Sequence, residues 1–145
     1  NSLQFNIKNK DILDLYSGSG SLGIESLSRG ANFVTFIENS NDCITILKQN
    51  LKEYENNYKI TKSSVDKFLQ TSLSTYDIVF YDPPFKKETD VVKNEVVKIY
   101  NILNMNGFVV IHRHTASTEF DILKNYKIHK EKKYGQSNIL ILRKL

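Results

Sequence analysis

The 145-residue chain lacks the features of disulfide-rich and membrane proteins. Its one cysteine, Cys43, cannot form an intramolecular disulfide, and because no catalytic signature surrounds it, we interpret it as a buried core thiol in a predicted helix. The sequence has no run of about eighteen or more apolar residues and no basic-then-apolar opening segment, which excludes a membrane span and a signal peptide. We therefore expect a cytoplasmic protein without membrane contact, with a monomer as the default.

Internal repeats and low-complexity linkers are also lacking. With 40% hydrophobic residues, a chain of this length can bury one core, so we predict a single domain over residues 1–145. The formal net charge of +4 is unevenly spread, since seven Lys or Arg residues and one Glu lie between Lys124 and Leu145. This basic tail either contacts phosphates or forms a solvated surface, and its charge favours neither interpretation.

Apolar runs rich in β-branched and aromatic residues alternate with segments of helical spacing. The runs at 11–15, 33–37, 58–62, 76–81 and 108–112 predict strands, and the segments around 22–27, 44–51 and 92–103 predict helices. This alternation predicts an α/β fold: a Rossmann-like, mostly parallel sheet with helices on both faces, in which ligands bind beyond the carboxyl ends of the strands. Two further runs, 128–132 and 139–142, are separated by a short segment and predict an antiparallel hairpin at one sheet edge.

A glycine-rich loop follows the first predicted strand. Gly18, Gly20 and Gly23 satisfy the dinucleotide-binding pattern literally, and their flexibility lets the backbone approach a ligand closely. Glu38 lies twenty residues after Gly18, at the end of the second predicted strand, where a carboxylate would bind ribose hydroxyls. The loop therefore indicates a nucleoside-containing cofactor without distinguishing NAD from S-adenosylmethionine.

Asp14, at the end of the first predicted strand, favours S-adenosylmethionine. A carboxylate there would repel the pyrophosphate of NAD, whereas S-adenosylmethionine carries an ammonium and a sulfonium. We predict that Asp14 and the backbone of 18–20 bind the methionine end and that Glu38 binds the ribose. The alternatives are that Asp14 accepts hydrogen bonds from loop amides and that Glu38 is a solvated strand end. The predicted cofactor site comprises Asp14, Tyr16, Ser17, Gly18, Ser19, Gly20, Glu38, Asn39, Ser64 and Val65.

The fourth predicted strand ends in Asp82-Pro83-Pro84-Phe85, which contains both prolines of the chain. Two prolines hold the backbone extended and poor in amides, so carbonyl oxygens can face outward as acceptors beside the Asp82 carboxylate. Such acceptors suit the exocyclic amine of a base, whose lone pair is delocalised into the ring, and Phe85 can stack on an extruded base. A Pro-Pro turn alone is usually only a turn, but its position after a cofactor loop and four strands makes Asp82, Pro83, Pro84 and Phe85 the predicted catalytic residues.

The two motifs together resemble class I methyltransferases with an aspartate-proline-proline-aromatic motif, and most of all the RsmD family of bacterial 16S ribosomal RNA guanine-N2 methyltransferases. The resemblance rests on residues 13–30 (LDLYSGSGSLGIESLSRG), on Phe36-Ile37-Glu38, on 77–86 with its DPPF, and more loosely on Lys133-Tyr134-Gly135. It implies a seven-stranded sheet with the last strand inserted antiparallel and S-adenosylmethionine as cofactor. It also implies methyl transfer to the N2 amine of a guanine, with 16S rRNA or the small ribosomal subunit as partner.

The chain departs from this family at three places. The basic N-terminal arm of the family is absent, and only Phe5-Asn6 matches the segment that follows it. Relatives carry Asp or Asn near the adenine after the third strand. This chain has Ser64 there and Asp66 two residues later, and the sequence leaves open which of the two contacts adenine. The fifth predicted strand ends in His112-Arg113-His114 where relatives carry an acid. Because no other Cys or His lies near this stretch, we predict no metal site and interpret it as a basic strand end near RNA or a plain surface.

Three other functions are compatible with the same residues. An N6-adenine DNA methyltransferase would present similar acceptors to its base, but such enzymes add a target-recognition domain that does not fit in 145 residues. An NAD-linked oxidoreductase would account for the glycine pattern. A non-catalytic RNA-binding module is the third alternative, if the N-terminal arm of the family is essential for activity.

Overall fold

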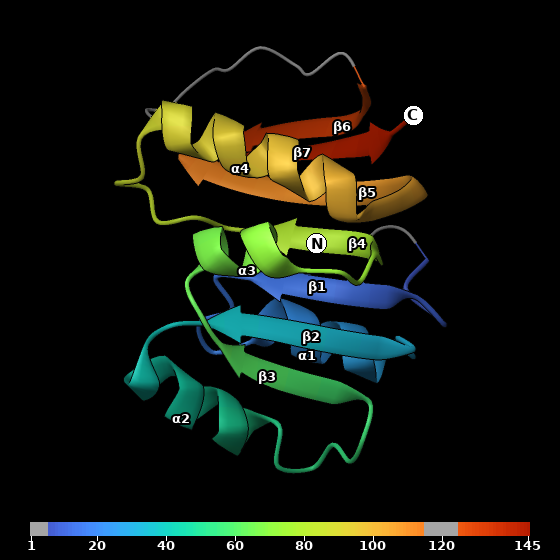
Figure 1. The fold of residues 1–145 in the computed structure, drawn as a ribbon, viewed down its shortest axis with the longest axis vertical. Helices are drawn as coiled ribbons and strands as arrows, with labels where there is room; N and C mark the ends of the chain where they lie inside the picture. The colour runs from blue at the N-terminus through green and yellow to red at the C-terminus, as the bar shows by residue number, and fades with distance from the viewer. Residues whose placement is uncertain (1–5, 115–124) are drawn as a thin grey trace.

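The computed structural model of the chain describes residues 6–114 and 125–145, which form one β-sheet with helices on both faces (Figure 1). The strands are β1 (Asp11–Leu15), β2 (Phe33–Glu38), β3 (Tyr58–Lys62), β4 (Tyr76–Tyr81), β5 (Leu103–His114), β6 (Tyr126–Tyr134) and β7 (Ser137–Lys144). Their order is β3-β2-β1-β4-β5-β7-β6. Strands β1 to β5 pair in parallel, and β7 lies between β5 and β6, antiparallel to both. The predicted fold class, its edge hairpin and the inserted antiparallel strand are therefore confirmed.

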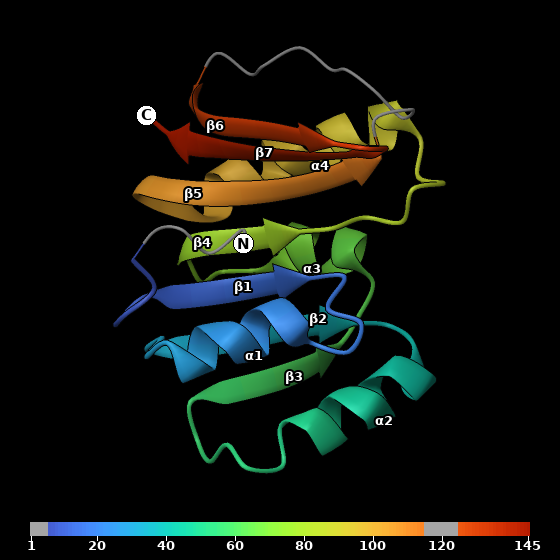
Figure 2. The same cartoon turned by 180° about the vertical axis from the view of Figure 1, so that it is seen from behind.

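Two layers of helices cover the sheet. Helices α1 (Ser21–Ser28) and α2 (Asn41–Asn50) lie on one face and α3 (Val65–Thr71) and α4 (Thr89–Ile102) on the other, as Figures 1 and 2 show from opposite sides. Successive residues of the central strands face opposite layers. Ile12 and Ile78 pack with α1 and α2, whereas Leu13 and Val79 pack with α3 and α4. Because these strands are buried on both faces, they consist of nearly continuous apolar runs, which made them recognisable in the sequence.

Some element bounds differ from those predicted. Strands β1, β3 and β4 have the predicted bounds, whereas β5 begins at Leu103, directly after α4, and not at 108. Asn104, Asn106 and Gly107 are poor strand formers, which hid the first part of β5. Helix α3 was not predicted, because a seven-residue helix with two buried residues, Val65 and Leu69, is too short to show a periodic pattern.

Cys43 was predicted to be a buried core thiol, and this is wrong: the residue is half-buried. It lies in the first turn of α2, where the Ser40 side chain accepts a hydrogen bond from the Cys43 amide and caps the helix. The fully buried residues of this region, Leu47 and Leu51, come later. The beginning of the helix therefore lies outside the core.

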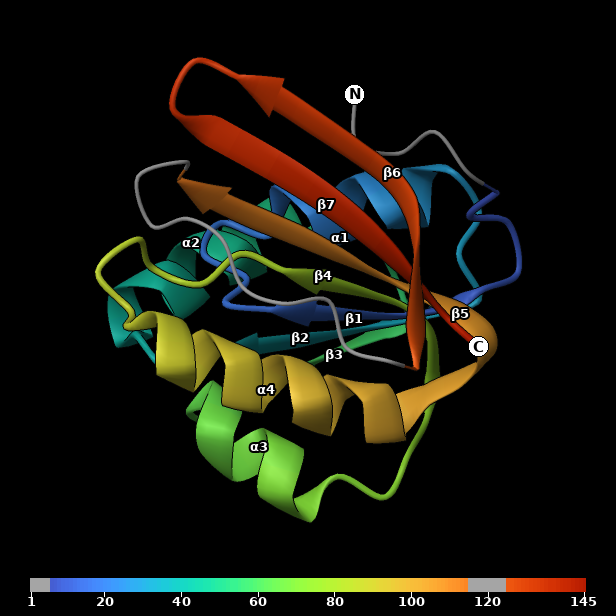
Figure 3. The ribbon, with the colours of Figure 1, turned by 90° about the horizontal axis from the view of Figure 1, so that it is seen from above.

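The parallel arrangement brings the loops after β1 to β4 and the end of β5 to one edge of the sheet. Their strand arrows point to the same side in Figure 1, and Figure 3 shows the loops gathered there above the ends of α3 and α4. The sequence motifs all lie at this carboxyl edge: the glycine loop after β1, Glu38 at the end of β2, Ser64 after β3 and Asp82 after β4. Among the helices of the described residues, none has the length and apolarity that crossing a membrane requires.

Replacing Gly23 with Ala should destabilise the fold. A Cβ atom at Gly23 would lie 2.3 Å from Cε1 of Phe36, whose side chain is fully buried, and 3.0 Å from Oδ2 of Asp14. Overpacking of this kind lowers the free energy of unfolding by about 1 to 3 kcal/mol, measurable by urea denaturation. Ser21→Ala, an exposed change in the same helix, should stay within about 0.5 kcal/mol of the parent. Equal stability of Gly23→Ala and the parent would show that α1 does not pack this closely on β2.

Candidate active site

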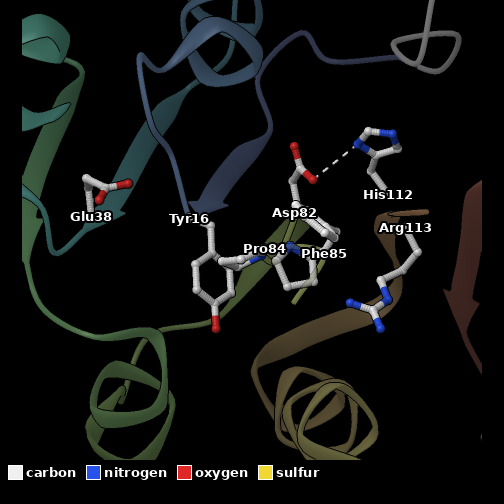
Figure 4. A pocket seen from close by; sticks show the side chains of 8 residues that line it. Tyr16, Glu38, Asp82, Pro84, Phe85, His112 and Arg113 are labelled. Atoms are coloured by element: carbon white, nitrogen blue, oxygen red, sulfur yellow. Dashed lines mark hydrogen bonds and ion pairs between the residues drawn. The ribbon is translucent and has the colours of Figure 1, made fainter. Parts of the chain in front are cut away.

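Two neighbouring pockets open at the carboxyl edge of the sheet. The larger has a volume of about 460 Å³ and is lined by Tyr16, Glu38, Asp82, Pro83, Pro84, Phe85, His112 and Arg113 (Figure 4). The smaller, of about 160 Å³, is lined by Tyr16, Ile37, Glu38, Asn39, Ser63, Ser64, Val65, Asp66 and Lys87. Tyr16 and Glu38 line both pockets, so the two form one continuous cleft. All four predicted catalytic residues lie in the larger pocket, and five of the predicted cofactor residues (Tyr16, Glu38, Asn39, Ser64 and Val65) lie in the smaller one.

The glycine loop is a tight turn held by hydrogen bonds to neighbouring strands. The Ser17 hydroxyl donates to the carbonyl oxygens of Asp14 at 2.7 Å and Ile37 at 3.1 Å. The Gly20 amide donates to the Ser17 carbonyl at 2.8 Å. Gly18 has a φ of +57°, and a Cβ there would meet no atom within 4 Å, so the space beside its backbone is open. Asp14, Ser17, Gly18, Ser19 and Gly20 do not line either of the two pockets, and their predicted contacts with a cofactor remain predictions.

Glu38 links the glycine loop to the beginning of α2. Its Oε1 accepts a hydrogen bond from the Gly18 amide at 2.9 Å, and its Oε2 accepts from the amides of Asn39 at 3.0 Å and Ser40 at 2.9 Å. The carboxylate is therefore held in a fixed orientation by three backbone donors, and it is not merely a solvated strand end. Figure 4 shows it on one side of Tyr16, with the Asp82–Phe85 segment on the other side.

Asp14 is buried beneath the glycine loop, with 4% of its surface exposed. Its Oδ2 accepts a hydrogen bond from the Gly23 amide at 3.1 Å, which is the loop-amide contact of the alternative interpretation. Burial raises the pKa of Asp14 to about 8; the Gly23 amide opposes this shift, and the negative charges of Asp82 and Glu38 add to it. The carboxyl edge of the sheet therefore favours positive charge.

The Asp82–Phe85 segment leaves β4 with Pro83 buried and the other three residues exposed. The Pro84 carbonyl accepts a hydrogen bond from the Lys87 amide at 2.9 Å and closes a turn. Oδ1 of Asp82 lies 3.1 Å from Nδ1 of His112, at the end of β5. The Phe85 ring is 59% exposed at the rim of the larger pocket, which is the placement that stacking on a base requires.

The sequence analysis missed Glu95, a buried acid of α4 with 3% of its surface exposed. Its carboxylate accepts hydrogen bonds from the hydroxyls of Tyr16 and Tyr81. Burial, together with this carboxylate, raises the pKa values of both tyrosines. A signal was present, because Glu95 lies three residues after Val92 and four before Ile99, on the apolar face of the predicted helix.

Arg113 was interpreted as part of a basic strand end near RNA or a plain surface; the plain surface is wrong, because Arg113 is 6% exposed, and the proximity to RNA remains a prediction. Arg113 lies two residues after Ile111 on β5 and therefore faces the same side of the sheet, where Ile111 packs with residues of α3 and α4. Nη2 donates to the Lys87 carbonyl at 3.3 Å, whereas Nε and Nη1 have no hydrogen-bond partner among the residues that the structure describes. Within the described ranges, no group of three or more His, Cys, Asp or Glu side chains is placed to hold a metal ion.

Ser64 and Asp66 both line the smaller pocket. The Ser64 side chain accepts a hydrogen bond from the Lys67 amide and caps α3, while Asp66 forms an exposed ion pair with Lys98 at 3.3 Å. Ser64 is therefore held by the helix that it caps, and Asp66 is tied to α4. Which of the two contacts an adenine remains a prediction.

Comparisons with known proteins agree with this geometry. A family model described as conserved hypothetical protein 95 matches residues 1–143. An uncharacterized methylase of Rickettsia prowazekii is 31% identical over 182 residues, covering 94% of this chain and 77% of that protein. Ribosomal RNA small subunit methyltransferase D of Buchnera aphidicola subsp. Acyrthosiphon pisum is 33% identical over 133 residues, covering 87% of this chain and 66% of the relative. A putative methyltransferase of Escherichia coli superposes with a TM-score of 0.87 at 26% identity, over 95% of this chain and 78% of that one.

The sheet order, the inserted antiparallel strand and the cleft at the carboxyl edge define a class I methyltransferase fold. The chain belongs to the family described as conserved hypothetical protein 95, the RsmD family of S-adenosylmethionine-dependent methyltransferases. The chain spans 66% of the length of the Buchnera relative and 63% of its Escherichia coli K12 counterpart.

Asp14 should make the stability of the protein depend on pH. The folded-state pKa of about 8 lies above the ordinary value of 3.8. The stabilisation linked to the protonated carboxyl is therefore complete below about pH 4, falls between about pH 4 and 8, and is lost above pH 8. The free energy of unfolding should fall over this window by up to about 1.4 kcal/mol per pH unit. Asp14→Asn, which cannot ionise, should remove this fall in urea denaturation between pH 5 and 8.

Asp42→Asn, which replaces an exposed acid of α2, is the matched control and should keep the pH dependence of the parent. If Asp14→Asn and the parent lose stability in parallel across this range, Asp14 is ionised in the folded protein and the assigned pKa is wrong.

Proposed function

We propose that this chain transfers a methyl group from S-adenosylmethionine to the N2 amine of a guanine in 16S ribosomal RNA. The observation that carries the proposal is the divided cleft, in which Tyr16 lies between the Glu38 carboxylate and the Asp82–Phe85 segment (Figure 4). A methyl donor and a base amine can thus approach each other from two adjoining pockets. Relatives named ribosomal RNA small subunit methyltransferase D support an rRNA target in the small subunit.

The residues of the smaller pocket fit the adenosine part of the cofactor. A carboxylate has about four acceptor sites, and three backbone amides bind Glu38, which leaves capacity to accept from a ribose hydroxyl. Ile37 and Val65 supply apolar surface for a base, beside the polar groups of Asn39 and Ser64. This mixture of apolar walls and a few oriented polar groups is typical of cofactor sites.

The charges at the carboxyl edge fit the methionine part better than a pyrophosphate. Asp14, Glu38 and Asp82 lie close enough for the charges of Glu38 and Asp82 to raise the pKa of Asp14. A cationic ligand would relieve this repulsion and favour the ionised form of Asp14, whereas a dianion would increase it. These charges disfavour an NAD-linked oxidoreductase. Calorimetric titrations with S-adenosylmethionine and with NADH would test which of the two cofactors binds.

The larger pocket fits the base amine. We assign Asp82 and the Pro83 carbonyl as acceptors of hydrogen bonds from the NH2 group, which would localise the nitrogen lone pair, and Phe85 as the ring that would stack on the base. When bound, S-adenosylmethionine supplies a methyl group activated by its sulfonium. As the new carbon–nitrogen bond forms, the carbon–sulfur bond breaks, and the amine then loses one proton to the exposed Asp82 carboxylate or to solvent. Positioning supplies much of the acceleration in such an in-line displacement.

Arg113 supports guanine over adenine as the target. Its guanidinium is always charged, and two of its nitrogens lack hydrogen-bond partners among the described residues although it lines the larger pocket. Leaving such buried donors unpaired is costly, and a turn of the guanidinium toward the pocket would let an acceptor on the substrate offset the cost. Guanine presents the O6 acceptor where adenine presents an amino donor, and arginine is the common partner of guanine acceptors. Because Arg113 suits the O6 acceptor of guanine, an N6-adenine methyltransferase is the second candidate.

Exposed lysines on the edge strand β6 are the proposed RNA contacts beyond the cleft. They are Lys127, Lys130, Lys132 and Lys133, whereas Lys124, also part of the predicted basic tail, lies outside the described residues. Lys86 and Lys87 follow the catalytic segment at the mouth of the cleft. Phosphate contacts by such side chains position RNA without reading its sequence, so base choice remains with the larger pocket.

Asp82→Ala and Glu38→Ala should separate catalysis from cofactor binding. Asp82→Ala should lower turnover by about two to four orders of magnitude with nearly unchanged affinity for S-adenosylhomocysteine. Glu38→Ala should weaken that affinity by about 1 to 3 kcal/mol, because the lost hydrogen bonds involve a charged group, while the rate at saturating cofactor changes less. Transfer of a tritiated methyl group to 16S rRNA or small subunits gives the rates, and calorimetry gives the affinities.

Glu53→Ala, an exposed acid outside both pockets, controls for the loss of one negative charge. An active Asp82→Ala enzyme would refute the catalytic assignment, and unchanged cofactor affinity in Glu38→Ala would remove Glu38 from the cofactor site.

Arg113→Met should abolish discrimination between two bases that share the N2 amine. Guanosine monophosphate carries O6, and the matching 2-aminopurine nucleotide lacks it, so the parent should favour guanosine monophosphate as an inhibitor by about 1 to 3 kcal/mol. The two nucleotides should inhibit the Arg113→Met variant equally. Arg143 is a half-buried arginine of β7, and the Arg143→Met variant should keep the preference of the parent. A preference that survives in Arg113→Met would show that Arg113 does not read the base.

A further inference from the structure

Tyr16 occupies a strained backbone conformation at the centre of the cleft. Its φ is +57°, in the left-handed region that side chains other than glycine rarely adopt. Such a conformation persists only where surrounding contacts determine it, and it tends to occur at functional sites. The contacts that hold Tyr16 should therefore matter for the cleft.

The main polar contact of Tyr16 comes from α4, far away in the sequence. Its hydroxyl donates to Oε1 of Glu95 at 2.9 Å and lies 3.1 Å from Oε2, and the Tyr81 hydroxyl donates to the same Oε1. Within the described residues, Glu95 has no Lys, Arg or His partner within 4 Å. A buried acid without a counter-charge is expensive unless hydrogen bonds stabilise it, so the two hydroxyls and the carboxylate hold one another in place.

The ring of Tyr16 lines both pockets. On one side it packs at 5.9 Å, centroid to centroid, against the ring of Tyr81, and the Lys87 ammonium lies 5.6 Å from its centroid. Figure 4 shows the ring between Glu38 and Pro84, with its hydroxyl directed away from both toward the helical layer. The ring is thus a wall of the cleft, and the hydroxyl is its anchor.

We propose that Glu95 is a positioning residue that anchors Tyr16 as the wall between the cofactor pocket and the base pocket. The inference rests on the proposed function, because it concerns how the two ligands are placed relative to each other. Methyl transfer needs the reacting atoms in line at about 3 to 3.5 Å, and a displacement of about 1 Å can cost a hundredfold in rate. Helix α4 therefore acts on the reaction through Tyr16 without contacting either ligand.

The test compares two tyrosine-to-phenylalanine changes. Tyr16→Phe keeps the ring and removes the anchor. Tyr126→Phe is the matched control, because this buried hydroxyl also bonds α4, donating to the Val96 carbonyl at 3.2 Å, but Tyr126 lines neither pocket. Both variants lose the hydrogen bonding of one tyrosine hydroxyl to the same helix. A purely structural role for the anchor would therefore give them similar behaviour.

Two readouts go beyond stability. Tyr16→Phe should lower kcat by roughly 10- to 100-fold and increase amide hydrogen exchange in the loop 17–20, whereas Tyr126→Phe should change neither beyond its effect on overall stability. Glu95→Gln should speed loop exchange in the parent and add little in Tyr16→Phe, because the anchor is already absent. Equal loop exchange in the two tyrosine variants, or equal kcat in the two, would overturn the proposal.

Hydrogen exchange also separates this proposal from the proposed function. If the parent transfers no methyl group to RNA, the proposed function fails, yet faster loop exchange in Tyr16→Phe and Glu95→Gln would still support the anchor. If the parent is active and loop exchange is unchanged in both variants, the anchor fails and the proposed function stands.

Discussion

The position of the cleft follows from the point where the parallel sheet reverses its winding. From β1, strands β2 and β3 are added toward one edge of the sheet, and β4 and β5 are added toward the other. The parallel strands β1 and β4 are therefore neighbours whose following loops diverge. Ligands of open α/β sheets bind in the crevice that this divergence creates. The glycine loop follows β1 and Asp82 follows β4, so the topology brings the two most informative motifs of the sequence together although more than sixty residues separate them.

Three acidic side chains in and beneath the cleft are held by neutral donors. Glu38 is bound by three backbone amides, Asp14 by the Gly23 amide and Glu95 by two tyrosine hydroxyls. Donors fixed by the backbone and by packing keep these groups oriented before any ligand arrives, which lowers the cost of reorganisation during the reaction. The same arrangement favours a cationic cofactor and leaves the guanidinium of Arg113 as a buried positive group facing the base pocket.

The sequence predicted the fold well because its signals are local. Strands β1, β2 and β4 are buried on both faces and read as nearly continuous apolar runs, and the glycine loop and the double proline each directly follow one of these strands. Long-range relations left no comparable signal: Glu95 meets Tyr16 through the packing of α4 on the sheet, and Arg113 is buried on the face of β5 where Ile111 packs with residues of α3 and α4. Glu95, an isolated acid among Val92, Val96 and Ile99, was missed, and its position in the sequence does not identify the tyrosines that it contacts. Helix α3 was missed because it is too short to show a periodic pattern. The predicted burial of Cys43 was wrong because the first turn of its helix lies outside the core.

The central claim is that the larger pocket presents a guanine amine to the methyl donor. The most direct measurement is the identity of the methylated nucleoside, obtained by incubating the protein with S-adenosylmethionine and small ribosomal subunits that lack methylation by its family, digesting the RNA and analysing it by mass spectrometry. The account predicts N2-methylguanosine at one position of 16S rRNA, formed by the parent and absent with Asp82→Ala. Formation of N6-methyladenosine instead, or an equal yield of N2-methylguanosine from Asp82→Ala, would contradict it.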